Sequence, residues 1–313
     1  MTPKLSIVIP LYNEEGNLEK LHQQLTAVLN SLNSSYEIIF VDDGSTDQSL
    51  AILEKVYQQK ANQTIKIIQL TKNFGKASAL SAGFAESEGE IIITIDADLQ
   101  DDPAEIPKLL AKINEGYDLV SGWRTERQDS FKKTLPSKVF NKAVAIFSGL
   151  KMHDFNCGLK AYQKIALAQV NIYGGLYRFL PVFIHHQGFS VVEVPVEHHH
   201  RFWGKSKYGG KRLWQGLLDF LTVILLTNYF TRPIHFFGGL GLLAFFAGFL
   251  IDFYLAILRI FTGSIQGHNP LLMLGTLLII VGVQLLSLGL IGEMMVSFFQ
   301  QKNKGYLVRK IWK

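Results

Sequence analysis

The chain has 313 residues, which suits one large globular domain together with a smaller part. Its single cysteine, Cys157, excludes an internal disulfide and is typical of a protein whose globular part lies in a reducing compartment. The formal net charge of +5 fits either nucleic acid or an anionic membrane surface as a partner. Basic residues gather in Lys205–Arg212 and Lys302–Lys313, on either side of an apolar C-terminal third, so we expect a membrane partner and no nucleic acid.

The first half of the chain alternates apolar runs rich in Ile and Val with amphipathic stretches. The expected strands are Leu5–Pro10, Tyr36–Val41, Ile65–Leu70, Ile91–Ile95 and Leu119–Ser121. The expected helices are Leu18–Leu32, Gln48–Gln59, Lys76–Ser87 and Pro103–Glu115. This alternation predicts an α/β fold with a mostly parallel sheet that is flanked by helices. In such a sheet, ligands bind beyond the carboxyl ends of the strands.

The acidic segment Asp96–Asp102 directly follows an expected strand. If it stays extended, Asp96, Asp98 and Gln100 point to one side, because alternate residues of extended chain share a face. Oxygen ligands at the carboxyl edge of a sheet suit Mg²⁺ or Mn²⁺. The alternative is a solvated acidic loop that caps the helix beginning at Pro103, and Asp101 or Asp102 is expected to provide that cap.

A second polar segment, Val41–Asp47, also follows a strand. Its carboxylates could accept hydrogen bonds from a nucleobase or a ribose. Considered alone, the segment is better explained as a strand-to-helix turn, in which Asp, Gly and Ser are the usual residues.

Two apolar stretches in the C-terminal third are long enough to cross a membrane. Pro233–Ile251 has no Asp, Glu, Lys or Arg, the apolar run continues past Asp252 to Leu258, and Leu271–Gly292 has no charge. The basic residues lie mainly outside this pair, so the positive-inside rule predicts that both chain ends and the globular domain are cytoplasmic. Asp252 and Glu293 are expected near the ends of the spans. Val139–Leu150 and Leu213–Phe230 are candidates for helices in the membrane interface, although the first could be an ordinary core helix.

Taken in order, several motifs of the chain resemble those of the inverting family-2 glycosyltransferases. They are similar to the dolichyl-phosphate mannose synthase-like branch, and the pair of spans resembles bacterial polyprenyl-phosphate (bactoprenol) glucosyltransferases. The resemblance covers about residues 4–230. It is carried by Ser6–Glu15, Val41–Asp47, Asn73–Lys76, Asp96–Asp101, Gly122–Arg124, Asp154–Lys160 and Trp203–Tyr208.

This resemblance implies a fold of the GT-A type and assigns roles to individual residues. Asp154 matches the catalytic acidic residue, acting either as a base or as a positioning group. Asp96, Asp98 and Gln100 match the ligands of Mg²⁺ or Mn²⁺. The residues implied for the acceptor phosphate are Arg124, Lys133 and Ser137, where Lys133 replaces an arginine that is common in relatives and so loses the bidentate geometry. Those implied for the nucleotide-sugar donor are Pro10, Tyr12, Glu14, Asp42, Lys76, Asp96, Arg201 and Lys205.

The implied function is transfer of a hexose, with inversion, from a nucleotide sugar to polyprenyl phosphate. UDP-glucose is the favoured donor, and mannosyl or N-acetylglucosaminyl transfer, a processive polysaccharide synthase and a non-catalytic membrane scaffold are the alternatives. The expected organisation is a cytoplasmic catalytic domain (1–212), a juxtamembrane amphipathic helix (213–232), two transmembrane helices (233–299) and a basic cytoplasmic tail (300–313). We expect a multi-pass protein of the inner (cytoplasmic) membrane. Small residues such as Ala244 and Gly248 would also allow a homo-oligomer.

Overall fold

The computed structural model describes residues 3–59, 65–125, 141, 144–145, 148–168, 170, 174–199, 222 and 233–302, with side chains up to residue 295. The chain divides into two compact units, Met1–Val223 and Ile224–Lys313. Several of the sequence predictions fall outside the described residues. These are the roles of Lys133, Ser137, Arg201 and Lys205, the helix at 213–232 (apart from residue 222) and the tail beyond residue 302.

The first unit is built on a mixed sheet with the strand order β3-β2-β1-β4-β6-β5-β7. Its central strands are short Ile- and Val-rich runs that are buried on both faces, as helices on both sides of a sheet require. The fold is therefore the expected α/β arrangement with a mostly parallel sheet. The strands are β1 (Leu5–Leu11), β2 (Tyr36–Asp42), β3 (Ile65–Gln69), β4 (Ile91–Thr94), β5 (Leu119–Arg124), β6 (Lys160–Gln163) and β7 (Val191–Val196).

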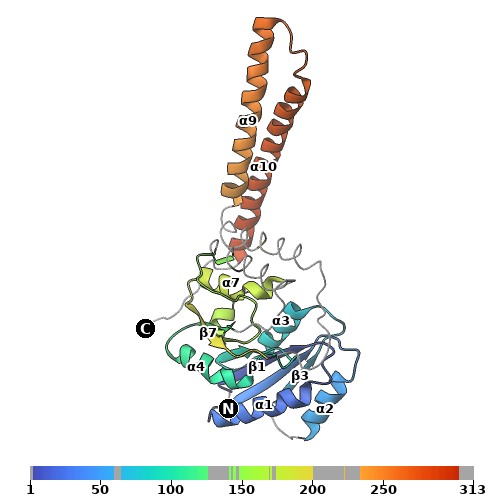
Figure 1. Cartoon of the computed structure of the whole chain (residues 1–313), viewed down its shortest axis with the longest axis vertical. Coiled ribbons are helices and arrows are strands. Elements are labelled where there is room, and N and C mark those ends of the chain that lie inside the picture. Colours follow the sequence, from blue (N-terminus) through green and yellow to red (C-terminus); the bar gives the residue numbers. More distant parts are fainter. Residues whose placement is uncertain are drawn as a thin grey trace. The chain divides into compact units, whose positions relative to one another are not determined.

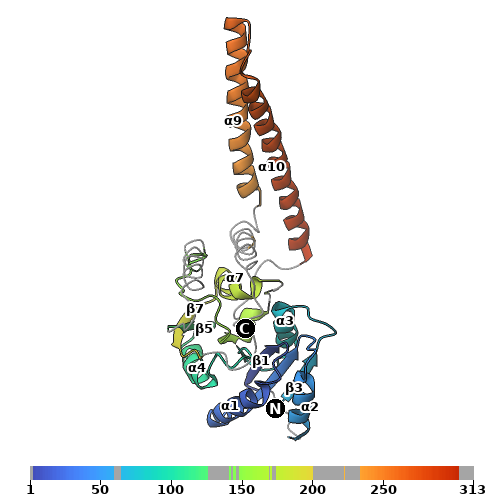
Figure 2. The same cartoon turned by 45° about the vertical axis from the view of Figure 1, so that its right-hand side comes forward.

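Helices cover both faces of this sheet (Figures 1 and 2). The main apolar core lies on the face of α1, α2 and α4, where α1 buries residues at helical spacing, among them Leu18, Leu21, Leu25 and Leu29. On the other face, α3 packs so closely on β1 that a Cβ at Gly83 would lie 2.3 Å from Val8 Cγ1. The helices of this unit are α1 (Leu18–Ser31), α2 (Ser49–Gln59), α3 (Lys76–Glu86), η1 (Pro103–Glu105), α4 (Ile106–Asn114), α6 (Lys164–Leu167), η2 (Leu176–Phe179) and α7 (Leu180–His186).

The direction of β6 is the feature of the fold that decides where the site lies. β6 runs antiparallel between β4 and β5, with Lys160 in register with Thr94 and Ser121. Because β6 begins at the edge where β4 and β5 end, the segment that precedes it is delivered to the carboxyl edge of the sheet. Sequence periodicity identified neither β6 nor β7, since both are short and fall between polar loops.

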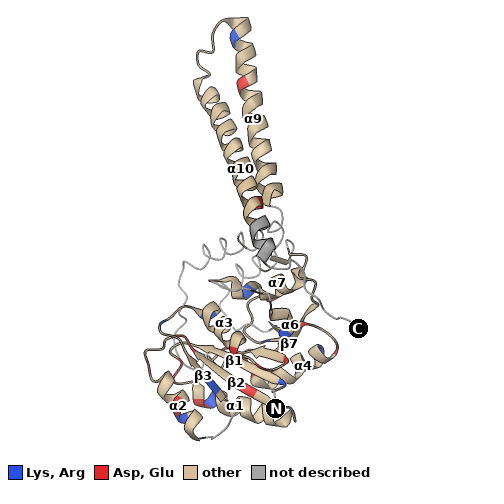
Figure 3. Cartoon of the chain, turned by 180° about the vertical axis from the view of Figure 1, so that it is seen from behind, with Lys and Arg blue, Asp and Glu red and all other residues tan. Residues whose placement is uncertain are grey.

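The second unit is a hairpin of α9 (Pro233–Thr262) and α10 (Asn269–Lys302). Both helices are long and apolar enough to cross a membrane, over Pro233–Thr262 and Asn269–Met295. Their most apolar stretches are only 17% and 11% buried, so most of their large apolar side chains face outwards. Such a surface suits lipid and would be a liability in water. Charged side chains are correspondingly sparse on these helices and frequent in the first unit (Figure 3).

Small residues of the two helices face each other inside this hairpin. A Cβ at Gly248 would lie 2.4 Å from the carbonyl oxygen of Gly275, and one at Gly275 would lie 2.1 Å from Asp252 Oδ1. Gly248 thus lets the two spans pack closely within one chain, as expected of a small residue at this position.

Of the two acidic residues of the hairpin, Asp252 lies elsewhere than expected, whereas Glu293 lies near the end of the second span, as expected. α9 continues past Asp252 to Thr262, so Asp252 lies within the helix and not at its end, and Thr276 Oγ1 donates to its Oδ2 at 3.3 Å. Glu293 lies within α10, where its Oε2 accepts the backbone N–H of Ile234 at 3.5 Å. That N–H belongs to the first turn of α9 and has no partner within its own helix, which explains an acid at this position.

Candidate active site

The loops that follow β1 and β2 are tied to each other at the carboxyl edge of the sheet. The backbone N–H of Asn13 donates to Ser45 Oγ at 2.9 Å, and the N–H of Thr46 donates to Asn13 Oδ1 at 2.8 Å. Asn13 adopts a φ of 53°, a left-handed conformation that asparagine tolerates better than most residues. Polar residues of two separate motifs thus form one continuous rim.

The predicted donor residues of this rim differ in their surroundings. Asp42 is fully buried, and its Oδ1 accepts the N–H of Ser45 at 3.0 Å. Within the described part of the chain, its Oδ2 has no hydrogen-bond partner, which is costly unless a ligand or water supplies one. Pro10 is buried within β1 beside Val41, Glu14 accepts from Asn17 Nδ2 at 2.7 Å, and Tyr12 is half-buried.

Asp43 is a structural residue of the site that the sequence reasoning did not single out. Its carboxylate accepts the N–H groups of Phe74 and Gly75, at 2.7 and 2.9 Å. This fixes the start of α3 and so places Lys76, whose ammonium pairs with Asp96. A turn after β2 requires only one aspartate, so the second aspartate of the Asp42-Asp43 pair could have indicated this role from the sequence.

The acidic segment after β4 is a turn and not extended chain. Ala97–Leu99 turns sharply, with Leu99 at a φ of 57°. The argument that Asp96, Asp98 and Gln100 share a face because they alternate is therefore wrong. The turn itself folds this segment back on itself, and the Gln100 N–H donates to Asp98 Oδ1 at 3.3 Å. As expected, Asp102 caps η1 by accepting the N–H of Ala104 at 2.8 Å.

The site concentrates negative charge in a small volume. A Cβ at Gly158 would lie 2.6 Å from Asp96 Cγ and 2.7 Å from Asp101 Oδ2, so only glycine allows this approach. Burial, and then the charge of Asp96, raise the pKa of Asp101 to about 7. Burial would also raise the pKa of Asp96, but the neighbouring Lys76 ammonium lowers it below its usual value.

These acids fit a divalent cation. Asp96 and Asp98 carry the hard oxygen atoms that Mg²⁺ or Mn²⁺ prefers, and a cation bound by them would offset the repulsion that contributes to the raised pKa of Asp101. A second group of candidate ligand atoms, from Asp102, Glu197 and His199, gathers within 4.8 Å on a more exposed surface. His199 Nε2 lies 3.1 Å from Asp102 Oδ2, while His198 Nδ1 lies 2.9 Å from the Gln100 carbonyl oxygen. These two consecutive histidines thus bind different partners.

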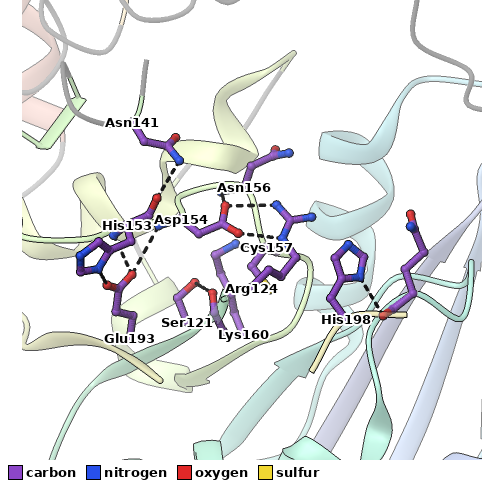
Figure 4. A network of polar contacts seen from close by, with 12 residues as sticks. Ser121, Arg124, Asn141, His153, Asp154, Asn156, Cys157, Lys160, Glu193 and His198 are labelled. Carbon is purple, nitrogen blue, oxygen red and sulfur yellow. Dashed lines mark hydrogen bonds and ion pairs between the residues drawn. The ribbon is translucent and has the colours of Figure 1, made fainter. Parts of the chain in front are cut away.

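Asp154 is held by Arg124 in a bidentate pair (Figure 4). Arg124 Nε donates to Asp154 Oδ2 at 2.7 Å and Nη2 donates to Oδ1 at 3.1 Å, with the carboxylate almost fully buried. Burial alone would lower the pKa of the guanidinium, but the pairing raises it above its usual value. Two of its five N–H groups are thus directed at Asp154. Sequence reasoning placed Arg124 on the acceptor phosphate only and did not foresee this contact.

Lys160 does not act as the direct counter-ion of Asp154. Its ammonium donates to the carbonyl oxygen of Cys157, and burial lowers its pKa. The Cys157 thiol is also buried, and burial raises its pKa well above the usual value. Neither group has the exposure or the charge state of a nucleophile.

A pocket opens beside these residues, between α3, β6 and η2. Its lining includes Lys76, Asn156 and Lys160, together with Tyr177 and Arg178 from η2. The Lys76 ammonium lies over the Tyr177 ring, 5.2 Å from its centroid, within reach of a cation–π interaction. Sequence reasoning missed Tyr177 and Arg178 because they belong to none of the motifs.

Acids, lysines and a bidentate Arg–Asp pair thus gather at the carboxyl edge of a mostly parallel α/β sheet, which is where such folds bind their ligands. Residues 6–170 match the model of glycosyl transferase family 2. The chain belongs to this family and is a glycosyltransferase.

Curated relatives match over almost the whole chain. The dodecaprenyl-phosphate galacturonate synthase of Rhizobium johnstonii is 35% identical over 315 residues, covering 99% of this chain and 93% of that protein. The undecaprenyl-phosphate 4-deoxy-4-formamido-L-arabinose transferase of Pseudomonas aeruginosa is 36% identical over 290 residues, covering 92% and 84%. Among solved structures, glucosyl-3-phosphoglycerate synthase from Mycobacterium tuberculosis with Mn²⁺, uridine diphosphate and phosphoglyceric acid aligns with a TM-score of 0.56. At 19% identity, over 71% of this chain and 78% of that one, it shows the shared fold.

Proposed function

We propose that this glycosyltransferase moves a sugar from a nucleotide sugar to a polyprenyl phosphate at a membrane surface, with inversion at the anomeric carbon. The observation that carries the proposal is the meeting of two groups of residues at one sheet edge. The segment after β4 carries the acids and the Lys76–Asp96 pair, which suit a nucleoside diphosphate. The segment before β6 brings Asp154 to Arg124. The two apolar helices supply the anchor that a lipid acceptor requires.

On the donor side, the residues divide between the nucleoside and the diphosphate. Asp42 offers a buried carboxylate oxygen that could accept from a nucleobase, and Lys76 could neutralise phosphate charge. Asp96, Asp98 and Gln100 would hold Mg²⁺ or Mn²⁺, which stabilises the charge of a leaving nucleoside diphosphate. Arg201 and Lys205 are proposed for the same phosphates.

On the acceptor side, Arg124, Lys133 and Ser137 are proposed to bind the lipid phosphate. A phosphomonoester has a second pKa of about 6, so the acceptor is mostly dianionic at neutral pH and needs little help from a base. Attack is limited by alignment and by repulsion between anions. Since Arg124 offsets the charge of Asp154, a carboxylate can lie close to the reacting phosphate, and we propose that Asp154 mainly orients the reacting groups.

The identity of the sugar is an open part of the proposal. UDP-glucose is the donor favoured by the resemblance of the chain to bactoprenol glucosyltransferases. The two curated relatives are instead named for galacturonate and for 4-deoxy-4-formamido-L-arabinose. A uronic acid and a modified pentose therefore belong in the donor panel beside UDP-glucose, GDP-mannose and UDP-N-acetylglucosamine.

The test is to incubate membranes containing the chain with each nucleotide sugar and undecaprenyl phosphate, and to identify the lipid product by mass spectrometry. We expect one sugar to be transferred, with an anomeric configuration, read by NMR, opposite to that in the donor. Membranes containing Asp98→Ala serve as the control. Polymeric glycan as the product would favour the processive synthase, and absence of any lipid-linked sugar across the panel would overturn the proposal.

A further inference from the structure

Glu193, on β7, binds the backbone on both sides of the His153–Asp154 peptide bond (Figure 4). Its Oε2 accepts the N–H of His153 at 2.8 Å and that of Asp154 at 3.4 Å. Its Oε1 contacts Nδ1 of the His153 ring. Within the described part of the chain, the hydrogen bonds of this carboxylate therefore fall on Asp154 and on its immediate neighbour His153.

The contacts of Glu193 complement those of Arg124. Glu193 is in register with Ser121 in the parallel β5–β7 pair, and β5 ends at Arg124. Two paired strands thus each hold Asp154: β5 holds its carboxylate through Arg124, and β7 holds its backbone through Glu193. A residue whose backbone and carboxylate are both held in place has little freedom to rotate away.

Further contacts keep the His153 segment in place around this carboxylate. The imidazole of His153 stacks on the Trp123 ring, with centroids 4.2 Å apart and an angle of 14° between the planes. Asn141 Nδ2 donates to the His153 carbonyl oxygen at 2.7 Å. The Glu193 side chain is only 10% exposed whereas that of His153 is 66% exposed, so the carboxylate forms the buried base of this arrangement.

We propose that Glu193 is a positioning residue for the sugar-transfer reaction, and that it acts by fixing the backbone of Asp154. This inference rests on the proposed function, because it assigns Glu193 a role through Asp154. Glu193 itself contacts the loop and not the reacting atoms. A displacement of about 1 Å in a catalytic group can cost on the order of 100-fold in rate.

The competing account is that Glu193 is an ordinary buried glutamate that contributes only to stability. Glu37 offers a matched control in the same sheet. It is also buried, and its Oε1 accepts the N–H of Glu88 at 2.7 Å and the hydroxyl of Ser6 at 2.6 Å. It lies on β2, and the residues that it contacts, Ser6, Lys66 and Glu88, are not part of the site.

The test compares Glu193→Ala, Glu193→Gln and Glu37→Ala in full-length protein in membranes, with turnover normalised to folded protein. We expect Glu193→Ala to lower kcat by about 10- to 100-fold, with donor and acceptor KM changing by less than about threefold. Glu193→Gln retains one oxygen acceptor and should recover part of this loss. Glu37→Ala should keep the wild-type kcat. In an Asp154→Ala background, Glu193→Ala should cause no further loss, because residues that act through one another are not additive.

Hydrogen exchange supplies a readout that does not depend on activity. Glu193→Ala should accelerate exchange in a peptide covering His153 and Asp154, while Glu37→Ala should accelerate it around Glu88. Wild-type kcat in Glu193→Ala, or unchanged exchange at His153–Asp154, would overturn the inference. A wild-type chain that makes no lipid-linked sugar would instead overturn the proposed function, and the exchange result would still decide whether Glu193 fixes this segment.

Discussion

The pairing of Asp154 with Arg124 bears on whether Asp154 acts as a base or as a positioning group. The fork of the guanidinium matches both carboxylate oxygens, so the charge of Asp154 is neutralised without a proton. An immobile carboxylate whose two oxygens accept from a guanidinium suits orientation of substrates better than it suits proton abstraction.

The corresponding prediction concerns Asp154→Asn. The amide keeps the shape of the side chain and one acceptor oxygen, but it cannot take a proton. We expect measurable turnover, well above that of Asp154→Ala, with little further loss as the pH falls towards 6. The measurement is the rate of lipid product formation across this pH range. An Asp154→Asn enzyme that is as inactive as Asp154→Ala, yet still binds donor and acceptor, would show that charge or basicity is essential.

Asp98 gives the prediction for the metal. Because Asp98 and its acidic neighbours crowd one turn, their repulsion is best relieved by a divalent cation. Asp98→Ala should abolish turnover, and a chelator should do the same to the wild type until Mg²⁺ or Mn²⁺ is restored. Glu19→Ala, at an exposed acid of α1, is the control. Full activity in the presence of the chelator would remove the metal from the mechanism.

Glu37 gives a prediction for stability as a function of pH. Burial would raise its pKa, but hydrogen bonds from Lys66, Ser6 and the Glu88 N–H outweigh burial and lower the pKa below the usual value for glutamate. Since the folded pKa is the lower one, the stabilisation is present above about pH 4.5 and is lost as the pH falls through the folded value. Glu37→Gln should therefore destabilise the protein at pH 7, with a difference from wild type that narrows towards pH 4. Denaturant unfolding at the two pH values measures this, and an equal difference at both would contradict the assignment.

At the scale of elements, close contact between α9 and α10 depends on glycines that face the other helix. Gly248 packs against the backbone of Gly275, whereas a Cβ at Gly239 on the same helix would have no atom within 4 Å. Replacing either glycine by leucine raises the helix propensity by the same amount. Comparing the two substitutions therefore separates the effect of packing from that of helix propensity.

We expect Gly248→Leu to destabilise the hairpin by about 1–3 kcal/mol, a typical effect of overpacking, and Gly239→Leu to have little effect. The measurement is thermal unfolding in detergent, monitored by the accessibility of cysteines introduced into α9. Equal effects of the two substitutions would indicate that the hairpin is not packed along this line of glycines.

At the scale of the whole molecule, the topology follows from the distribution of basic residues. Basic clusters flank the two helices, while the connector between α9 and α10, residues 263–268, contains neither Lys nor Arg. The positive-inside rule then places this connector outside the cell and both chain ends in the cytoplasm.

A cysteine introduced at Ser264 should therefore label with an impermeant maleimide in intact cells, and one at Lys304 should be protected until the membrane is opened. The native Cys157 gives little background, because it is buried and its pKa is raised. The reverse labelling pattern would invert the proposed orientation.

Sequence reasoning succeeded where local chemistry decides the structure. The Ile- and Val-rich runs are strands, the helix from Leu18 ends within one residue of the expected Leu32, and Asp102 caps the helix that follows it. It failed at the Asp96–Gln100 segment, where a left-handed Leu99 turns the chain and removes the assumed alternation. Side-chain periodicity holds only when the backbone conformation is known.

By itself, the sequence determined the family, the α/β alternation, the apolar helices and the types of residue available for chemistry. Each depends on local patterns. Buried strands and membrane spans need continuous apolar residues, and polar residues at the ends of strands indicate a ligand site. Only the tertiary structure decided which of these residues meet. The pairing of Asp154 with Arg124, of Lys76 with Asp96 and of Glu193 with the His153–Asp154 backbone joins residues that are distant in the chain. Such contacts depend on the order and direction of strands, above all on the antiparallel β6, which no local pattern encodes.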